Sequence, residues 1–364
     1  MGKQELFLFS HATLLISDLA GNIFPGITSG DLCIVKQKIA MKKTASVILQ
    51  WVTFFWMVAL FQIDLQTARA ADIYEDSFGY SKNIRLDTRS GYRKGNLNWN
   101  IAAPDYSPNI LSELQYDNLT IYEAGFDVKA VVNKLYSKAS ISFGKIAEGT
   151  GTDSDYQEND RNSIYSQSES SLSDEIQDLS IGFGYQVDFL KNRLLVAPHV
   201  GLSYHTQKIR QTDGIQTITL SDDLPPPSSR EISGLNSTYE SNWRTVFAGF
   251  DLDCEIIYQI HMIASIEYHT ASFKAYADWN LRDDFAHPVS FMHEADGQGR
   301  IMNVGINRLF AERWLIGLTY GWQVWDTDPG TDTLYWSGGG ATRSTLNEVN
   351  WESRSVNLSI GYNF

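Results

Sequence analysis

Four carboxylates lie in one polar stretch of the chain. The stretch Gly149–Asp160 reads GTGTDSDYQEND and contains Asp153, Asp155, Glu158 and Asp160. In an extended chain, residues two apart point to the same side, so Asp153 and Asp155 would face one cleft together. Close carboxylates share a proton, a property used in acid–base catalysis. The stretch is therefore either half of an active site or an acidic, solvated loop.

A calcium loop of the EF-hand type does not explain these carboxylates. Counted from Asp153, the sixth position is Glu158, where such a loop needs glycine. The twelfth position is Ile164, where the loop needs a bidentate glutamate. An EF-hand is excluded.

A second polar stretch contains a histidine that could act as a base. The sequence DDFAHP, residues 283–288, places Asp283 four residues and Asp284 three residues before His287. His293 and Asp296 follow in the same segment and are secondary candidates. The alternative interpretation of His287 is a loop histidine that precedes a proline.

The elements around both stretches alternate between apolar and polar residues, which predicts strands. The final segment shows the pattern clearly: Val356, Leu358 and Ile360 are apolar, whereas the residues between them are small or polar. We expect ten strands, near residues 82–94, 110–132, 136–147, 174–189, 193–209, 238–257, 262–279, 299–310, 313–326 and 350–364.

Three features favour a membrane barrel over a soluble sandwich. Many strands reach ten residues or more, aromatic residues gather toward strand ends, and short connections alternate with long ones. We therefore predict an all-β fold, a ten-stranded antiparallel transmembrane β-barrel with long extracellular loops in the outer membrane of a Gram-negative bacterium. The terminal aromatic Phe364 resembles the signal that the barrel-assembly machinery recognises in such proteins.

The barrel interpretation assigns faces to several charged residues. A narrow barrel is filled by side chains, so we expect lumen packing rather than a metal site for the residues on the polar face, His199, His205, Glu267 and His269. The alternation places Lys208 and Arg244 on the lipid-facing side of their strands, near the outer ends. Cations there could bind lipopolysaccharide phosphates.

The amino-terminal part of the chain has the plan of a secretory signal. Residues 41–70 begin with two lysines, continue with an apolar run and end in Ala-Arg-Ala, which predicts a signal peptide cleaved near Ala70. A membrane anchor is the alternative, because the apolar run approaches spanning length. We interpret residues 1–40 as an unstructured upstream extension and residues 71–364 as one barrel domain.

Cleavage at this site would leave an acidic protein with one cysteine. The formal net charge is −14 for the whole chain and −16 for the mature part, which argues against nucleic acid as a partner. Cys254 would be the one mature cysteine, so an intramolecular disulfide is not expected.

Two strand motifs resemble those of the omptins, ten-stranded outer-membrane endopeptidases. Residues 84–91 read IRLDTRSG, similar to the omptin first-strand pattern I-x-L-x-T-x-S-G, and SELQY at 112–116 resembles the second-strand pattern. The order of strands and loops agrees across the mature chain. The resemblance implies an aspartic-type endopeptidase that acts on peptides or proteins, needs lipopolysaccharide and uses no cofactor or metal.

The resemblance also implies roles for the candidate residues. Asp153-Ser154-Asp155, followed by an aromatic residue, resembles the omptin Asp-x-Asp motif that positions the attacking water. His287 would accept the proton of that water, oriented by Asp283 or Asp284. Omptins have Asp-x-His in this loop, whereas Phe285 occupies the first position here. The alternatives are a non-catalytic barrel acting as an adhesin or structural protein, and a small pore.

Overall fold

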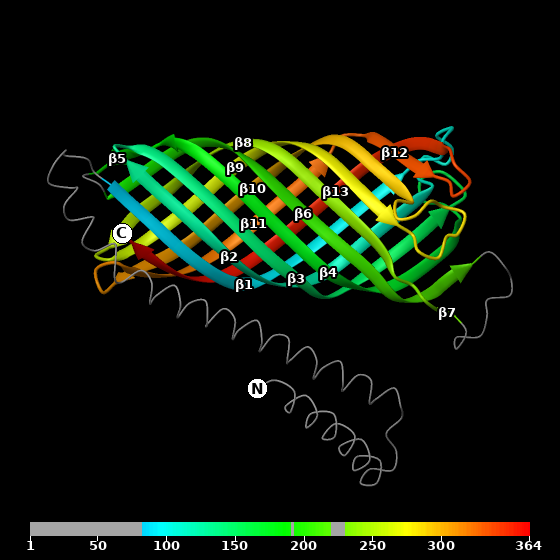
Figure 1. Ribbon diagram of the computed structural model, residues 1–364, viewed down its shortest axis with the longest axis horizontal. Coiled ribbons are helices and arrows are strands. Elements are labelled where there is room, and N and C mark those ends of the chain that lie inside the picture. Colours follow the sequence, from blue (N-terminus) through cyan, green and yellow to red (C-terminus); the bar gives the residue numbers. More distant parts are fainter. Residues whose placement is uncertain (1–81, 191–192, 220–229) are drawn as a thin grey trace, which may run out of the picture. The chain divides into compact units, whose positions relative to one another are not determined.

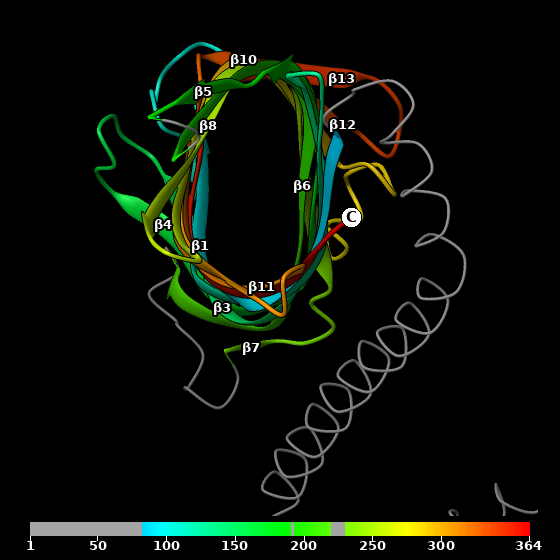
Figure 2. The same cartoon turned by 90° about the vertical axis from the view of Figure 1, so that its left-hand side faces the viewer.

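The structure, a computed structural model, describes residues 82–190, 193–219 and 230–364. Within these residues, ten long antiparallel strands form a closed sheet, since β1 pairs with both β2 and β13. The ring runs in the order β1, β2, β3, β4, β6, β8, β9, β10, β11, β13 (Figure 1, Figure 2). The predicted ten-stranded barrel is confirmed. Residues 1–40 and 41–70 lie outside the described part of the chain.

The strands are longer at their outer ends than the alternation pattern predicted. The ring consists of β1 (Lys82–Ile101), β2 (Ser112–Val132), β3 (Leu135–Tyr156), β4 (Ile164–Tyr185), β6 (Leu194–Thr219), β8 (Ser237–Ile257), β9 (Ile260–Asp278), β10 (Phe291–Phe310), β11 (Trp314–Thr327) and β13 (Ala341–Asn363). Three short strands join it: β5 (Val187–Phe189), β7 (Glu231–Ile232) and β12 (Gly330–Tyr335). Most ring strands far exceed the roughly 9–11 residues that cross a bilayer, so the wall continues beyond the membrane.

The lengthening corrects one prediction directly. Residues 148–173 were expected to form a loop, but β3 continues to Tyr156 and β4 begins at Ile164. Polar residues do not end these strands because β2 and β4 pair with both sides of this part of β3 and satisfy its backbone groups. The short connection expected between the strands near 110–132 and 136–147 is present, since β2 ends at Val132 and β3 begins at Leu135. The short connection expected between the strands near 174–189 and 193–209 includes residues 191–192, which lie outside the described residues.

The apolar faces of the strands point outward in the half of the barrel next to the short turns. Exposed residues there include Phe126, Val128, Phe143, Leu179, Ile181, Val200, Leu202, Val246, Leu318 and Leu358. Exposed tyrosines mark the outer edge of this band: Tyr92, Tyr122, Tyr268 and Tyr320. An outward apolar band edged by aromatic residues is the pattern of an outer-membrane barrel. Within the described ranges, no helix is long and apolar enough to cross a membrane.

The interior changes character along the barrel. Its outer half is filled by a layer of fully or almost fully buried aromatic side chains: Trp99, Tyr116, Tyr239, Trp243, Phe273, Trp325 and Trp351. Its inner half is polar and contains a cavity of about 510 Å³. The aromatic layer therefore separates the outer mouth from the polar lumen.

Candidate functional site at the barrel mouth

Asp153 and Asp155 lie near the outer end of β3, on its interior face. Gly151 shares this face and is the strand partner of Tyr116, which belongs to the aromatic layer. Asp153 is ten residues beyond Phe143 of the lipid-facing band, about 33 Å of extended chain. The two carboxylates are therefore outside the membrane-spanning part of β3. The strand geometry brings them to one side, as their spacing predicted.

The environment of the pair favours proton sharing near neutral pH. Burial raises the pKa of Asp153 to about 7, and the negative charge of Asp155 adds to the shift. Burial also raises the pKa of Asp155. A hydrogen bond from Ser112 and the positive charge of Arg282 lower this pKa and offset part of the shift. The Arg282 charge lowers the pKa of Asp153 as well. The two carboxylates therefore share one proton below neutral pH and lose it near neutral pH, where an efficient general base has its pKa.

A histidine–carboxylate pair lies in the loop between β9 and β10, at the same end of the barrel. His287 Nδ1 is 2.5 Å from Oδ1 of Asp278, the last residue of β9. The expectation that Asp283 or Asp284 orients His287 is wrong. Asp284 accepts two hydrogen bonds from Arg282. Within the described residues, the Asp283 carboxylate forms no hydrogen bond with His287, whose partner is Asp278. The loop folds back so that its far end returns to the end of β9.

Phe285 and Arg282 explain the shape of this loop. Phe285 is buried against Trp336, with the two ring centroids 5.7 Å apart. The Arg282 guanidinium lies 3.9 Å above the Phe285 ring centroid and forms the two-pronged pair with Asp284. These contacts fix a cation close enough to act on the charges of Asp153 and Asp155. Arg282 therefore brings this loop close to β3 at the outer end of the barrel. The cross-section of the barrel is elongated (Figure 2).

The secondary candidates His293 and Asp296 are not part of this constellation. His293 is fully buried in the aromatic layer, where its Nδ1 lies 3.0 Å from the Tyr239 hydroxyl and its Nε2 lies 3.4 Å from Asp332. Asp296 is exposed on the opposite face of β10. Neither residue meets the carboxylate pair.

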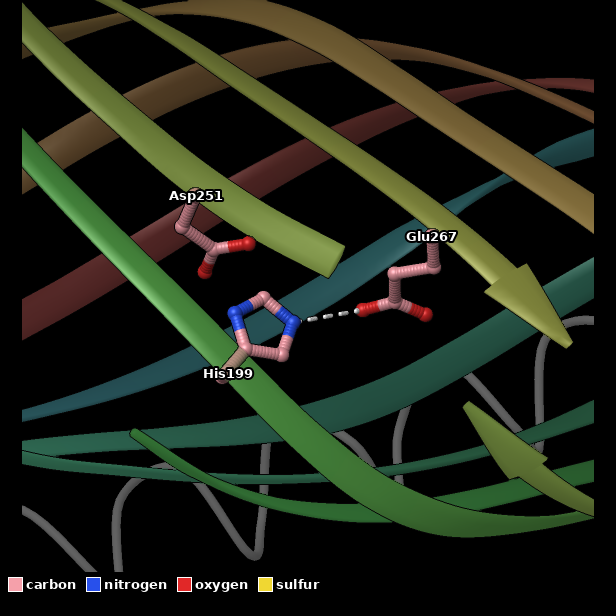
Figure 3. A group of neighbouring side chains, drawn as sticks. All are labelled: His199, Asp251 and Glu267. Atoms are coloured by element: carbon pink, nitrogen blue, oxygen red, sulfur yellow. Dashed lines mark hydrogen bonds and ion pairs between the residues drawn. The ribbon is translucent and has the colours of Figure 1, made fainter. Parts of the chain in front are cut away.

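The lumen histidines form a buried polar network, as predicted. His199, Asp251 and Glu267 could present three ligand atoms to one ion (Figure 3). However, the Lys138 ammonium lies between the two carboxylates, bonded to Glu267 and 3.2 Å from Asp251. Lys129 also donates to Asp251 at 2.9 Å. Two lysines thus already balance the two carboxylates, and a metal ion would add uncompensated buried charge.

The two predicted lipid-contact residues lie on the outer wall. Arg244 is exposed on β8, and Lys208 is half-buried on β6 between its strand partners Glu175 and Glu240. Both face outward near the edge of the apolar band. Binding of lipid phosphates by either residue stays a prediction.

Comparison with known proteins places the barrel in a family. The model of the family described as Protochlamydia outer membrane protein matches residues 87–364. The chain belongs to this family. As a member of it, and with outer-membrane barrels as structural neighbours, the protein is an outer-membrane protein. No curated relative matches the chain.

Two solved structures are similar to this family member, to different degrees. The outer membrane protease OmpT from Escherichia coli superposes with a TM-score of 0.63 and 10% identity, over 78% of this chain and 97% of that chain. A major outer membrane protein from Thermus thermophilus matches with a TM-score of 0.30 and 10% identity, over 78% of this chain and 100% of that one. At these identities, the comparison with OmpT shows a shared barrel fold.

Two residues of the mouth were not predicted from the sequence. Asp278 ends a strand nine residues before His287, a separation that does not suggest contact in any regular element. Arg282 acts through its charge on Asp153 and Asp155, and its position follows from its contact with Phe285, which packs on Trp336. The one signal for Asp278 was its position as the final polar residue of an alternating segment.

Proposed function

We propose that this family member is an omptin-like endopeptidase whose site is the outer mouth of the barrel. Asp153 and Asp155 would orient a water molecule, and His287, held by Asp278, would take its proton as the water attacks a peptide carbonyl. The observation that carries the proposal is two close carboxylates on β3 that interact with Arg282, together with a histidine–carboxylate pair in the loop that contains Arg282. The fold shared with OmpT supports the arrangement.

The substrate would be a peptide or protein reached from outside the cell. A preference for basic side chains does not follow from the first strand. Omptins have an acidic residue at the position that aligns with Gly95, and a side chain added here would meet the Trp351 ring at 2.6 Å. The strong negative charge of the chain favours basic substrates only through long-range attraction.

The test is peptide cleavage by the full-length protein folded in detergent, with and without lipopolysaccharide. A diverse peptide pool is incubated with the wild type and with the variants Asp155→Asn, His287→Ala and Asp278→Asn, and new peptide ends are identified by mass spectrometry. Asp283→Asn is the matched control, because this carboxylate has no partner in the described loop. New ends that disappear in the three variants and persist in the control support the proposal.

A non-catalytic barrel is the second candidate, favoured by the closed Arg282–Asp284 pair beside Phe285. A correctly folded barrel that cleaves nothing would support this candidate, acting as an adhesin or structural protein. A pore requires a path through the aromatic layer, and single-channel conductance in a planar bilayer tests for one. Steady ion conductance would favour the pore over both other candidates.

A further inference from the structure

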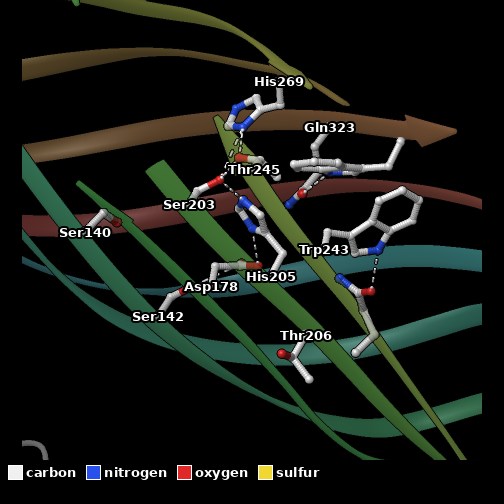
Figure 4. A network of polar contacts seen from close by, with 12 residues as sticks. Ser140, Ser142, Asp178, Ser203, His205, Thr206, Trp243, Thr245, His269 and Gln323 are labelled. Carbon is white, nitrogen blue, oxygen red and sulfur yellow. Dashed lines mark hydrogen bonds and ion pairs between the residues drawn. The ribbon is translucent and has the colours of Figure 1, made fainter. Parts of the chain in front are cut away.

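One interior serine has the hydrogen-bond partners of a hydrolase nucleophile (Figure 4). Ser203 Oγ lies 2.9 Å from Nε2 of His205, and His205 Nδ1 lies 2.9 Å from Oδ1 of Asp178. Ser203 and His205 are two residues apart on β6, and Asp178 is the strand partner of His205 on β4. A serine linked through both imidazole nitrogens to a carboxylate is the arrangement that activates a hydroxyl for acyl transfer.

The proton count of the network directs the Ser203 hydroxyl toward His205. The Asp178 carboxylate accepts a hydrogen bond from His205 Nδ1, so the other ring nitrogen, Nε2, carries no hydrogen and is an acceptor. Glu267, 3.2 Å from His269 Nε2, makes Nδ1 of His269 an acceptor in the same way. Two hydroxyls face these two acceptors: Ser203 at 2.9 Å from His205 and Thr245 at 3.0 Å from His269. Ser203 Oγ also lies 2.6 Å from Thr245 Oγ1 and 3.2 Å from His269 Nδ1. When Thr245 donates its hydrogen to Ser203 across the 2.6 Å contact, the Ser203 hydroxyl is directed to His205 Nε2.

Asp178 is held in place from its other side. Arg93 donates to Asp178 Oδ2 at 2.9 Å, and the Ser142 hydroxyl donates to the same oxygen at 3.3 Å. The remaining oxygen, Oδ1, faces His205. These contacts fix the carboxylate that sets the histidine tautomer, as nucleophile activation requires.

The polar cavity reaches the histidine and the carboxylate of this site. Its walls include Asp178, His205 and His269, and they extend to Asn83 and Asn363 at the inner ends of the strands. Ser203 lies next to this wall through its contact with His205, and 8% of its surface is exposed.

Arg93 adds donors to the same cavity. Its Nε and Nη1 are buried and have no hydrogen-bond partner in the described part of the chain. Unpaired buried donors are costly, and an oxygen of a bound ester would satisfy them. The cavity therefore borders the histidine and aspartate that partner Ser203 and offers the Arg93 donors to a polar ligand.

We propose that Ser203, His205 and Asp178 form a second catalytic site in the lumen, which hydrolyses small carboxylic esters. Ser203 Oγ attacks the carbonyl carbon and its proton passes to His205 Nε2. The bond to the alkoxide breaks, and the alcohol leaves with that proton. Water then attacks the acyl-serine by the same route, which releases the acid and restores Ser203. The site lies on the other side of the aromatic layer from the mouth, so it does not depend on the peptidase proposal.

The experiment is covalent labelling of the full-length folded protein in detergent with phenylmethanesulfonyl fluoride, followed by peptide mass spectrometry. We expect one sulfonyl group per chain, on Ser203. Asp178→Asn and His205→Asn should slow labelling by roughly 10²–10⁴-fold, the usual contribution of a general base. Ser180→Ala is the matched control, because Ser180 lines the same cavity and is the strand partner of Ser203. Heat-dependent gel migration verifies the fold of each variant.

Hydrolysis of p-nitrophenyl acetate provides the second measurement. The folded wild type and the control Ser180→Ala should both hydrolyse the ester, and Ser203→Ala should not. A folded wild type that is not labelled on Ser203 overturns the proposal. Labelling at an unchanged rate in folded Asp178→Asn also overturns it, because the serine would then react without its partners.

Discussion

Replacing Asp153 by asparagine should make the barrel more stable at neutral and alkaline pH. Burial raises the pKa of Asp153 from 3.8 to about 7. The unfolded chain ionises this group first as the pH rises, so folding stability is lost between these two pKa values. At about 1.36 kcal/mol per pH unit, the loss is about 1.7 kcal/mol at pH 5 and about 4 kcal/mol at pH 8. Asparagine cannot ionise and removes this penalty.

The measurement is the free energy of unfolding of the folded barrel in guanidinium chloride at pH 4, 5, 6.5 and 8. The difference between Asp153→Asn and wild type should be small at pH 4 and grow to about 4 kcal/mol at pH 8. Glu158→Gln is the matched control from the same stretch, since its side chain is exposed, and it should show no such trend. A difference that stays constant from pH 4 to pH 8 would refute the reasoning, because the pKa of Asp153 would then be ordinary.

Further outcomes follow from the mouth and the lumen. Arg282→Gln removes the positive charge that lowers the pKa of Asp153 and Asp155. The pH profile of peptide cleavage should therefore move to higher pH. An unchanged profile would contradict the action of the Arg282 charge on the two carboxylates. Asp278→Asn should reduce cleavage by roughly 10²-fold through loss of His287 orientation, measured as kcat/KM, with KM little changed. Lys138→Met leaves Asp251 and Glu267 without a shared cation, and should lower the free energy of unfolding by about 3–5 kcal/mol in guanidinium titrations. An exposed-lysine control, Lys94→Met, should change it by less than about 0.5 kcal/mol.

The barrel fold is determined locally, and the sequence therefore predicted it well. Alternation such as that of Val356, Leu358 and Ile360 assigns each side chain to a face whichever strand lies next to it. Every strand crosses the same bilayer. This explains the apolar outward faces, the aromatic residues at the strand ends and the regular alternation of short and long connections. The same periodicity placed Asp153 and Asp155 on one side of the chain, although it did not show that β3 continues through them.

The partners of the candidate residues were decided by the tertiary structure. Asp278 contacts His287 because Phe285 packs on Trp336 and folds the loop back. The residues of this loop do not belong to one regular helix or strand, so no sequence periodicity indicates these contacts. Asp178 meets His205 because the register of β4 against β6 sets them side by side. Strand register is fixed by turns and by neighbouring strands together, and a shift of one residue would reverse the face of each side chain. The sequence by itself determined which residues face inward; the closed sheet determined which of them touch.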